Sequence, residues 1–131
     1  MNGKVAWSDR AERAYGLIID YVAGEFGTTR ARQYVAEVHK TVARLPENPM
    51  IGQIEPLLEG SRYEFRRLVI GNLTKIIYRI AEERIEIADV WDTRKNPEEL
   101  AARFIDVCSG NNAPLTDEEI QAEVNAVRYS K

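Results

Sequence analysis

The chain has 131 residues and a formal net charge of −3, and 44% of its residues are hydrophobic and 30% charged. This size and composition are those of one globular domain, not of a disordered chain. No apolar run approaches the roughly 18 residues that a membrane span needs, and residues 1–10 lack the apolar core of a signal peptide. We therefore expect a cytoplasmic protein with no membrane partner. The chain has one cysteine and one histidine, which exclude an internal disulfide and a Cys/His metal array.

The first half of the chain predicts a short strand followed by two helices. Residues 3–7 form the strand candidate. Apolar side chains then recur at helical spacing over residues 11–22 and again over 31–45, and the glycines at 24 and 27 separate the two stripes. So short a turn between two helices predicts an antiparallel helical hairpin.

Residues 64–97 predict three consecutive strands of an antiparallel meander. Turn residues break the pattern at Gly71-Asn72, which we interpret as a two-residue hairpin turn, and again around Glu82-Glu83. Strand alternation on the middle run places Ile76, Tyr78 and Ile80 on one face and Lys75, Ile77 and Arg79 on the other. We expect the helical hairpin to cover the apolar face. The cations then lie on the opposite face.

The last part of the chain predicts two further helices. Asn96-Pro97-Glu98-Glu99 is a helix start, and that helix continues through Phe104 toward Cys108. Residues 109–131 are expected to form a linker and an amphipathic C-terminal helix beyond a domain of residues 1–108. The predicted fold is α+β: an N-terminal strand and a helical hairpin packed on an antiparallel sheet that the meander completes, followed by C-terminal helices.

Several segments in this order carry a resemblance to a known family. They are Glu47-Asn48-Pro49 with Gly52 after it, Arg66-Arg67-Leu68-Val69, Lys75-Ile76-Ile77-Tyr78-Arg79, and the run from Val90 to Pro97. Together with the order of elements they resemble the RelE/ParE superfamily of bacterial toxins, of the plasmid-stabilisation type, from type II toxin–antitoxin modules. The resemblance covers about residues 3–104. It implies a growth-inhibiting toxin that a cognate antitoxin neutralises, with no cofactor and no metal.

Two activities occur in that superfamily. RelE-like members are metal-independent endonucleases that cut mRNA on the ribosome, and ParE-like members bind DNA gyrase without being enzymes. Carried over to this chain, the nuclease alternative uses four catalytic cations: Arg66, Arg67, Lys75 and Arg94. Lys75 stands where nuclease members commonly carry an arginine, which loses the bidentate grip on a phosphate. The four cations have a structural alternative as well, because cross-strand pairing with Glu64, Glu86 and Asp92 is common on sheets.

The nuclease alternative lacks a convincing base. Nuclease members often place a His or Tyr near the end of the last strand, where this chain has Trp91 and Asp92. Asp92 is a weak base beside two cations, and His39 is expected on a helix surface. Tyr129 lies far along the tail. The acidic net charge also opposes RNA binding.

We therefore favour a ParE-like growth inhibitor that acts on gyrase. The residues expected to bind the antitoxin or the target are Trp91, Asp92, Arg94, Lys95 and Phe104. A degenerate toxin that only binds its antitoxin is a third alternative. Its assembly is expected to be either a homodimer or a toxin–antitoxin hetero-oligomer. The tail, residues 115–131, is either an antitoxin-like autoinhibitory helix or an ordinary packing helix.

Overall fold

The computed structural model describes residues 4–109. Its elements are β1 (Lys4–Trp7), α1 (Asp9–Phe26), α2 (Thr28–Val42), β2 (Gln53–Ile54), the 3₁₀ helix η1 (Pro56–Leu58), β3 (Arg66–Ile70), β4 (Thr74–Ala81), β5 (Arg84–Asp92) and α3 (Pro97–Ser109). The α+β class, the helical hairpin and the three-strand meander of the sequence analysis are confirmed. The predicted helix at residues 115–131 lies outside the described residues.

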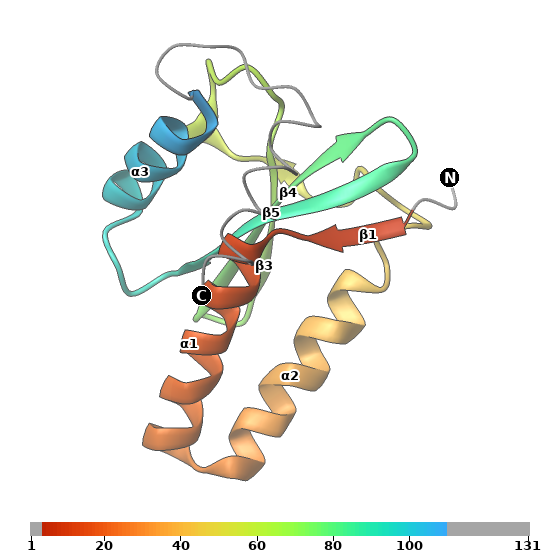
Figure 1. The fold of residues 1–131 in the computed structure, drawn as a ribbon. Coiled ribbons are helices and arrows are strands. Elements are labelled where there is room, and N and C mark those ends of the chain that lie inside the picture. The colour runs from red at the N-terminus through yellow and green to blue at the C-terminus, as the bar shows by residue number, and fades with distance from the viewer. Residues whose placement is uncertain (1–3, 110–131) are drawn as a thin grey trace.

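Five strands form one sheet in the order β1-β5-β4-β3-β2. The meander strands pair antiparallel, whereas β1 pairs parallel with β5, so the sheet is mixed. The helices α1 and α2 lie on one face of the sheet and α3 on the other (Figure 1). We call these the hairpin face and the α3 face. The N-terminal strand thus lies beside the last strand of the meander.

Local capping explains where the helices begin and end. Ser8 caps α1, because its Oγ accepts a hydrogen bond from the amide of Ala11 at 2.9 Å and donates one to the carbonyl of Ala88 at 2.7 Å. Gly27 separates α1 from α2 with φ of 91°, a conformation that side chains disfavour. At α3 the predicted cap is confirmed, since the Asn96 side chain accepts from the amide of Glu98.

The first turn of the meander is longer than predicted. Ile70 pairs with Thr74, so Gly71, Asn72 and Leu73 form a three-residue loop in place of a two-residue turn. Gly71 has φ of 56°, as the glycine there suggested. Leu73 is partly buried against the core, which explains why it leaves the strand register.

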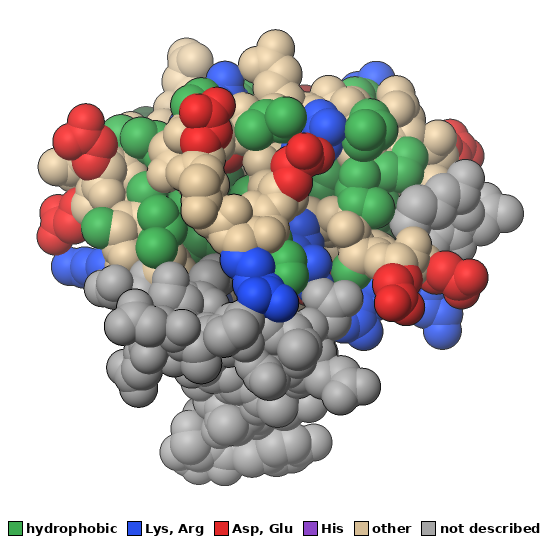
Figure 2. All heavy atoms as spheres, turned by 90° about the horizontal axis from the view of Figure 1, so that it is seen from above, with side chains coloured by type: hydrophobic (Ala, Val, Ile, Leu, Met, Phe, Trp, Pro, Cys, Tyr) green, Lys and Arg blue, Asp and Glu red, His purple; other side chains and the backbone are tan. Residues whose placement is uncertain are grey.

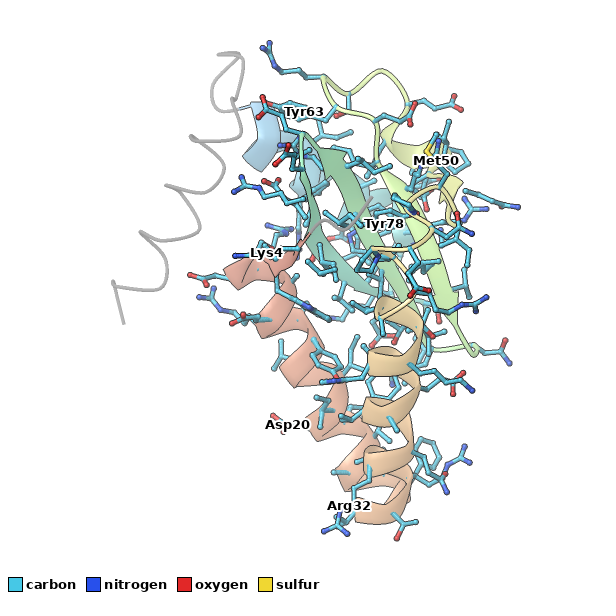
Figure 3. The ribbon with its side chains drawn as sticks, turned by 90° about the vertical axis from the view of Figure 1, so that its right-hand side faces the viewer. Lys4, Asp20, Arg32, Met50, Tyr63 and Tyr78 are labelled. Carbon is cyan, nitrogen blue, oxygen red and sulfur yellow. The ribbon has the colours of Figure 1, made fainter. Side chains whose placement is uncertain are left out.

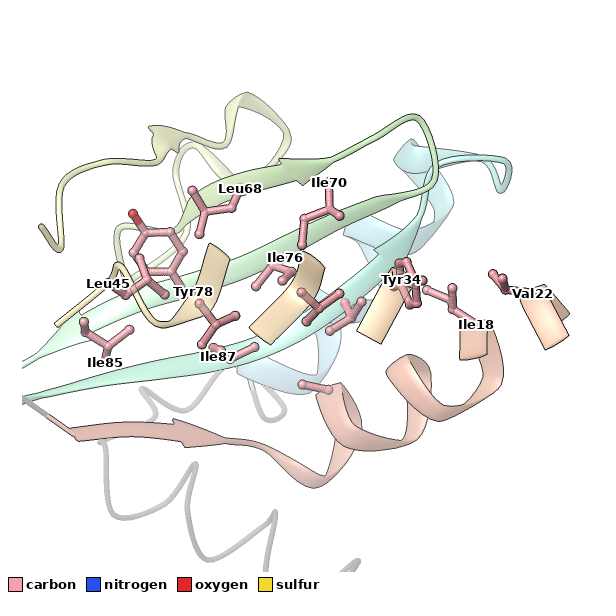
Figure 4. Close-up of a cluster of buried hydrophobic side chains, with 14 of the residues drawn as sticks. Ile18, Val22, Tyr34, Leu45, Leu68, Ile70, Ile76, Tyr78, Ile85 and Ile87 are labelled. Carbon is pink, nitrogen blue, oxygen red and sulfur yellow. The ribbon is translucent and has the colours of Figure 1, made fainter. Parts of the chain in front are cut away.

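The main core lies between the helical hairpin and the sheet. Ile76 and Tyr78 are fully buried there, as predicted for that face of β4, and pack with residues of both helices (Figure 4). Tyr34 of α2 joins Thr74 of β4 through hydroxyl groups 2.6 Å apart. Burying these apolar side chains supplies the main force that holds the hairpin on the sheet.

A second core lies on the α3 face, which the sequence analysis expected to be cationic. Its buried members are Leu58, Phe65, Ile77, Trp91, Ala101 and Phe104. The rings of Phe65 and Phe104 meet edge to face with centroids 5.0 Å apart. The α3 face is therefore partly apolar, and α3 covers that part.

A β-bulge in β5 decides which side chains reach which face. Ile77 pairs with Asp89 and Tyr78 with Ile87, so Ala88 is an extra residue on β5. Ile87 and Val90 consequently both enter the main core, although an odd spacing would otherwise send them to opposite faces. The bulge also sends Trp91 to the second core.

Candidate functional site

The four candidate cations do not form one cluster. Arg66 pairs with Tyr78 and Arg67 with Ile77, so the two arginines lie on opposite faces of β3, as the alternation predicted. Lys75 shares the α3 face with Arg67. Arg94 lies beyond the end of β5.

Glu55 holds two of these cations. Its carboxylate is 1% exposed and accepts a hydrogen bond from the Lys75 ammonium at 2.8 Å, and an Arg67 nitrogen lies 3.7 Å away. The same carboxylate accepts from the amide of Leu57 at 3.0 Å and so caps η1. The sequence analysis missed Glu55. Its signal was the pair Glu55-Pro56, a capping residue followed by proline at the first helical position.

Arg66 supports the loop that precedes β2. Its guanidinium donates to the carbonyl of Gly52 at 2.8 Å and to the carboxylate of Glu64 at 3.2 Å. The Tyr78 hydroxyl accepts from the Gly52 amide at 2.9 Å and donates to the Pro49 carbonyl at 2.8 Å. The loop that carried part of the family resemblance is thus held to β3 and β4 by hydrogen bonds from Arg66 and with Tyr78.

Arg94 is positioned by α1 and by the end of β5. It forms an ion pair with Asp92 and stacks on Tyr21 of α1, with its guanidinium carbon 3.5 Å from the ring centroid. Burial alone would raise the pKa of Asp92. Hydrogen bonds from Arg94 and the charges of Arg94 and Lys95 outweigh burial and hold that pKa below its ordinary value. Asp92 is therefore a poor proton acceptor at neutral pH.

Two of the residues expected at a binding surface are core residues. Trp91 is 1% exposed and Phe104 is 3% exposed, and both belong to the second core. The Trp91 indole donates to Asp89 at 2.8 Å. Within the run from Trp91 to Phe104, a continuous exposed stretch begins at Thr93 and ends at Glu99. It includes Arg94 and Lys95, and Ala102 and Arg103 are exposed further along α3.

Acidic side chains accompany two further basic side chains of the sheet, Arg79 and Arg84. Arg79 forms a cross-strand pair with Glu86 at 2.9 Å, and Arg84 reaches the same carboxylate at 2.6 Å. These contacts follow the ion-pair alternative of the sequence analysis. Basic and acidic side chains are interspersed on the molecule seen from above (Figure 2).

The sequence analysis also considered His39 and Tyr129 as bases, and a metal site and a membrane span. His39 is exposed on α2, as expected. Among residues 4–109 no group of three or more His, Cys, Asp or Glu side chains is arranged to hold a metal ion. No helix within that range is long and apolar enough to cross a membrane. Tyr129 lies outside the described residues.

Comparison with known proteins identifies the family. The model for the ParE toxin of type II toxin–antitoxin systems, parDE, matches residues 5–97. A chain in a solved structure of the chromosomal ParDE toxin–antitoxin system from P. aeruginosa has a TM-score of 0.58 with 17% sequence identity, covering 70% of this chain and 96% of that chain. No curated protein sequence matches. The structural likeness confirms the fold, and the family model covers most of the chain. The chain belongs to the ParE toxin family of type II toxin–antitoxin systems.

Proposed function

We propose that this toxin inhibits growth by binding DNA gyrase and that a cognate antitoxin neutralises it. One observation carries the proposal. Each of the four cations that RNA cleavage would require already has an acidic partner within the chain: Glu64 for Arg66, Glu55 for Arg67 and Lys75, and Asp92 for Arg94.

The chemistry of cleavage supports the same conclusion. A metal-independent nuclease needs a base for the 2′-hydroxyl and a cation free to stabilise charge on the phosphate. Lys75 would have to leave a buried carboxylate to reach a phosphate, and Glu55 would then keep only the more distant Arg67, 3.7 Å away, as a cationic partner. Asp92, with its lowered pKa, is a poor base. Protein binding requires neither group to be free.

The exposed stretch from Thr93 to Glu99 is the proposed gyrase-binding surface. Arg94 is fixed there between Asp92 and Tyr21, so little side-chain entropy is lost when it meets a partner. The buried Trp91 and Phe104 hold β5 and α3 on either side of the stretch. Preorganised arginines of this kind are common centres of protein interfaces.

A supercoiling assay with purified gyrase and the full chain tests the proposal. We expect inhibition at micromolar concentration, and we expect Arg94→Ala combined with Lys95→Ala to weaken it at least tenfold, a typical effect of losing a binding hot spot. Arg32→Ala is the matched control, because Arg32 is exposed at the far end of the hairpin (Figure 3). Uninhibited gyrase would refute the gyrase target.

A second assay distinguishes gyrase binding from the nuclease alternative. Primer extension on a reporter mRNA after a short pulse of expression should show an intact message in growth-arrested cells. Cuts inside the translated frame that disappear in Lys75→Ala would instead establish the nuclease. Restored growth on coexpression with the antitoxin encoded beside the toxin tests neutralisation.

A further inference from the structure

Basic side chains gather on the α3 face where β1, β5 and β4 lie side by side. Strand register aligns Lys4 with Arg84, and Arg79 with Glu86. Arg10 of α1 reaches the same face, where it pairs with Asp89 at 3.0 Å. We call this region the basic sheet face, and its members are Lys4, Arg10, Arg62, Arg79, Arg84, Glu86 and Asp89.

The basic sheet face has an excess of positive charge, opposite in sign to the net charge of the chain. Its basic side chains outnumber its two acidic ones, whereas the chain has a net charge of −3. Arg79 and Arg62 both lie against the ring of Tyr63, at 4.3 and 5.8 Å from its centroid. Such a concentration of positive charge in an acidic protein favours an acidic ligand.

Within residues 4–109, the described helices leave part of this face open. Phe104 and Ala101 of α3 pack toward Ile77 and Trp91, while α1 and α2 lie mainly against the hairpin face. Lys4 is exposed, and the Arg84 side chain is 39% exposed. Lys4 and Tyr63 lie on the same side of the molecule, away from Arg32 (Figure 3).

The Tyr63 hydroxyl lacks a hydrogen-bond partner among the described residues. It is buried, yet no described residue forms a hydrogen bond with it. A buried hydroxyl without a partner is costly, and most such groups are satisfied in folded proteins. The Tyr63 ring lies against Arg62 and Arg79 of the basic sheet face, so we infer that the partner of its hydroxyl belongs to whatever covers that face.

We propose that residues 115–131 of the same chain dock on the basic sheet face. The sequence of this tail places acidic residues on a predicted amphipathic helix whose apolar stripe is Ile120, Val124 and Val127; the acidic residues are Asp117, Glu118, Glu119 and Glu123. The charges of the tail and the face are complementary. The stripe has small side chains to pack on, since Ala6 and Ala88 are only partly buried.

Chain length allows this docking. The described part of the chain ends with α3, and Ile105 of α3 packs against the second core, as Ala88 of β5 does. The linker of residues 110–114 can span about 17 Å, and a helix over residues 115–131 is about 25 Å long, close to the length of β5 at about 30 Å. Attachment through so short a linker also gives the tail a high effective concentration at the face.

Docking in cis makes the tail a built-in competitor for the basic sheet face. An acidic partner that binds there must first displace residues 115–131. The proposed gyrase-binding stretch, residues 93–99, does not take part, so this inference stands apart from the gyrase proposal.

Disulfide trapping in the full chain tests the docking. In a Cys108→Ser background, Ala6→Cys with Val124→Cys should form an intramolecular disulfide at high yield in dilute protein. Arg32→Cys with Val124→Cys is the matched control and should form little. Equal yields for the two pairs, or disulfides between chains only, would overturn the proposal.

Hydrogen exchange gives a second test that needs no cysteine. Ile120→Asp with Val124→Asp should make the amides of β1 exchange about tenfold faster, because an edge strand loses its cover. Gln121→Asp with Asn125→Asp adds the same charge beside the stripe and should leave the exchange of the β1 amides unchanged. The exchange of the α2 amides should be unchanged in both double variants. Identical β1 exchange in the two double variants would contradict docking on this face.

Discussion

The Lys75 ammonium donates a hydrogen bond to the Glu55 carboxylate across 2.8 Å and so connects the middle of the sheet to the capping residue of η1. Because Glu55 is 1% exposed, removing the closer of its two cationic partners leaves a buried charge with only Arg67, 3.7 Å away, to compensate it. We expect Lys75→Met to lower the free energy of unfolding by about 2–4 kcal/mol. Urea denaturation measures it. Lys40→Met, on the exposed side of α2, should change stability by less than about 0.5 kcal/mol.

Gly52 is expected to be the glycine least tolerant of substitution among those described. A Cβ there would lie 2.5 Å from the Arg67 carbonyl oxygen and 2.6 Å from the Tyr78 hydroxyl. Gly52→Ala should therefore destabilise the protein by about 1–3 kcal/mol. Gly16→Ala is the matched control, because its Cβ meets nothing within 4 Å in the middle of α1. It should stabilise by about 0.5–1 kcal/mol, and a similar loss in both variants would refute this explanation.

Asp92 should contribute to the acid sensitivity of the fold. Its folded-state pKa is held below the ordinary value of 3.8, so the contribution is complete above that pH and is lost as pH falls through the lower, folded-state pKa. The stability difference between the wild-type chain and Asp92→Asn should therefore shrink below about pH 4. Chemical denaturation from pH 7 to pH 2.5 measures this. A difference that stays constant over the whole range would contradict it.

Tyr34 should have the corresponding effect at alkaline pH. Burial raises its pKa to about 12, with smaller effects from Thr74 and neighbouring charges. Unfolding would release the proton at a lower pH, so stability is complete below about pH 10 and falls as pH rises toward 12. Tyr34→Phe should cost about 1–2 kcal/mol at neutral pH, because the Thr74 hydroxyl loses its partner. That cost should diminish above pH 10, as measured by urea denaturation at each pH.

Periodicity was enough to predict the elements that repeat regularly. The stripe that includes Ile18 and Val22 in α1 and the apolar face that includes Ile76 and Tyr78 in β4 are each buried against a large partner, so their pattern is visible in the sequence. Ala88 could not be predicted, because a bulge is one residue in an otherwise ordinary strand. Its effect appears only when β4 is laid beside β5.

The candidate site was predicted less well than the fold. The sequence shows that Lys75 and Arg67 are basic, but their significance depends on Glu55, which arrives from a separate loop. Trp91 and Phe104 were expected at a binding surface because they bound the run that follows the last strand, but large aromatic side chains also form cores, as these two do. Hydrophobicity alone does not separate the two roles. The functional roles of Arg94 and Lys95 stay predictions.

Because β1 pairs with β5, the sheet can be completed only late in synthesis. Of the five described strands, β1 is made first, and its partner, residues 84–87, belongs to the strand that is made last. Until then the backbone of β1 has no partner strand, and closing so long a loop is slow. The sheet of a nascent toxin therefore cannot be completed at β1 until β5 has been made.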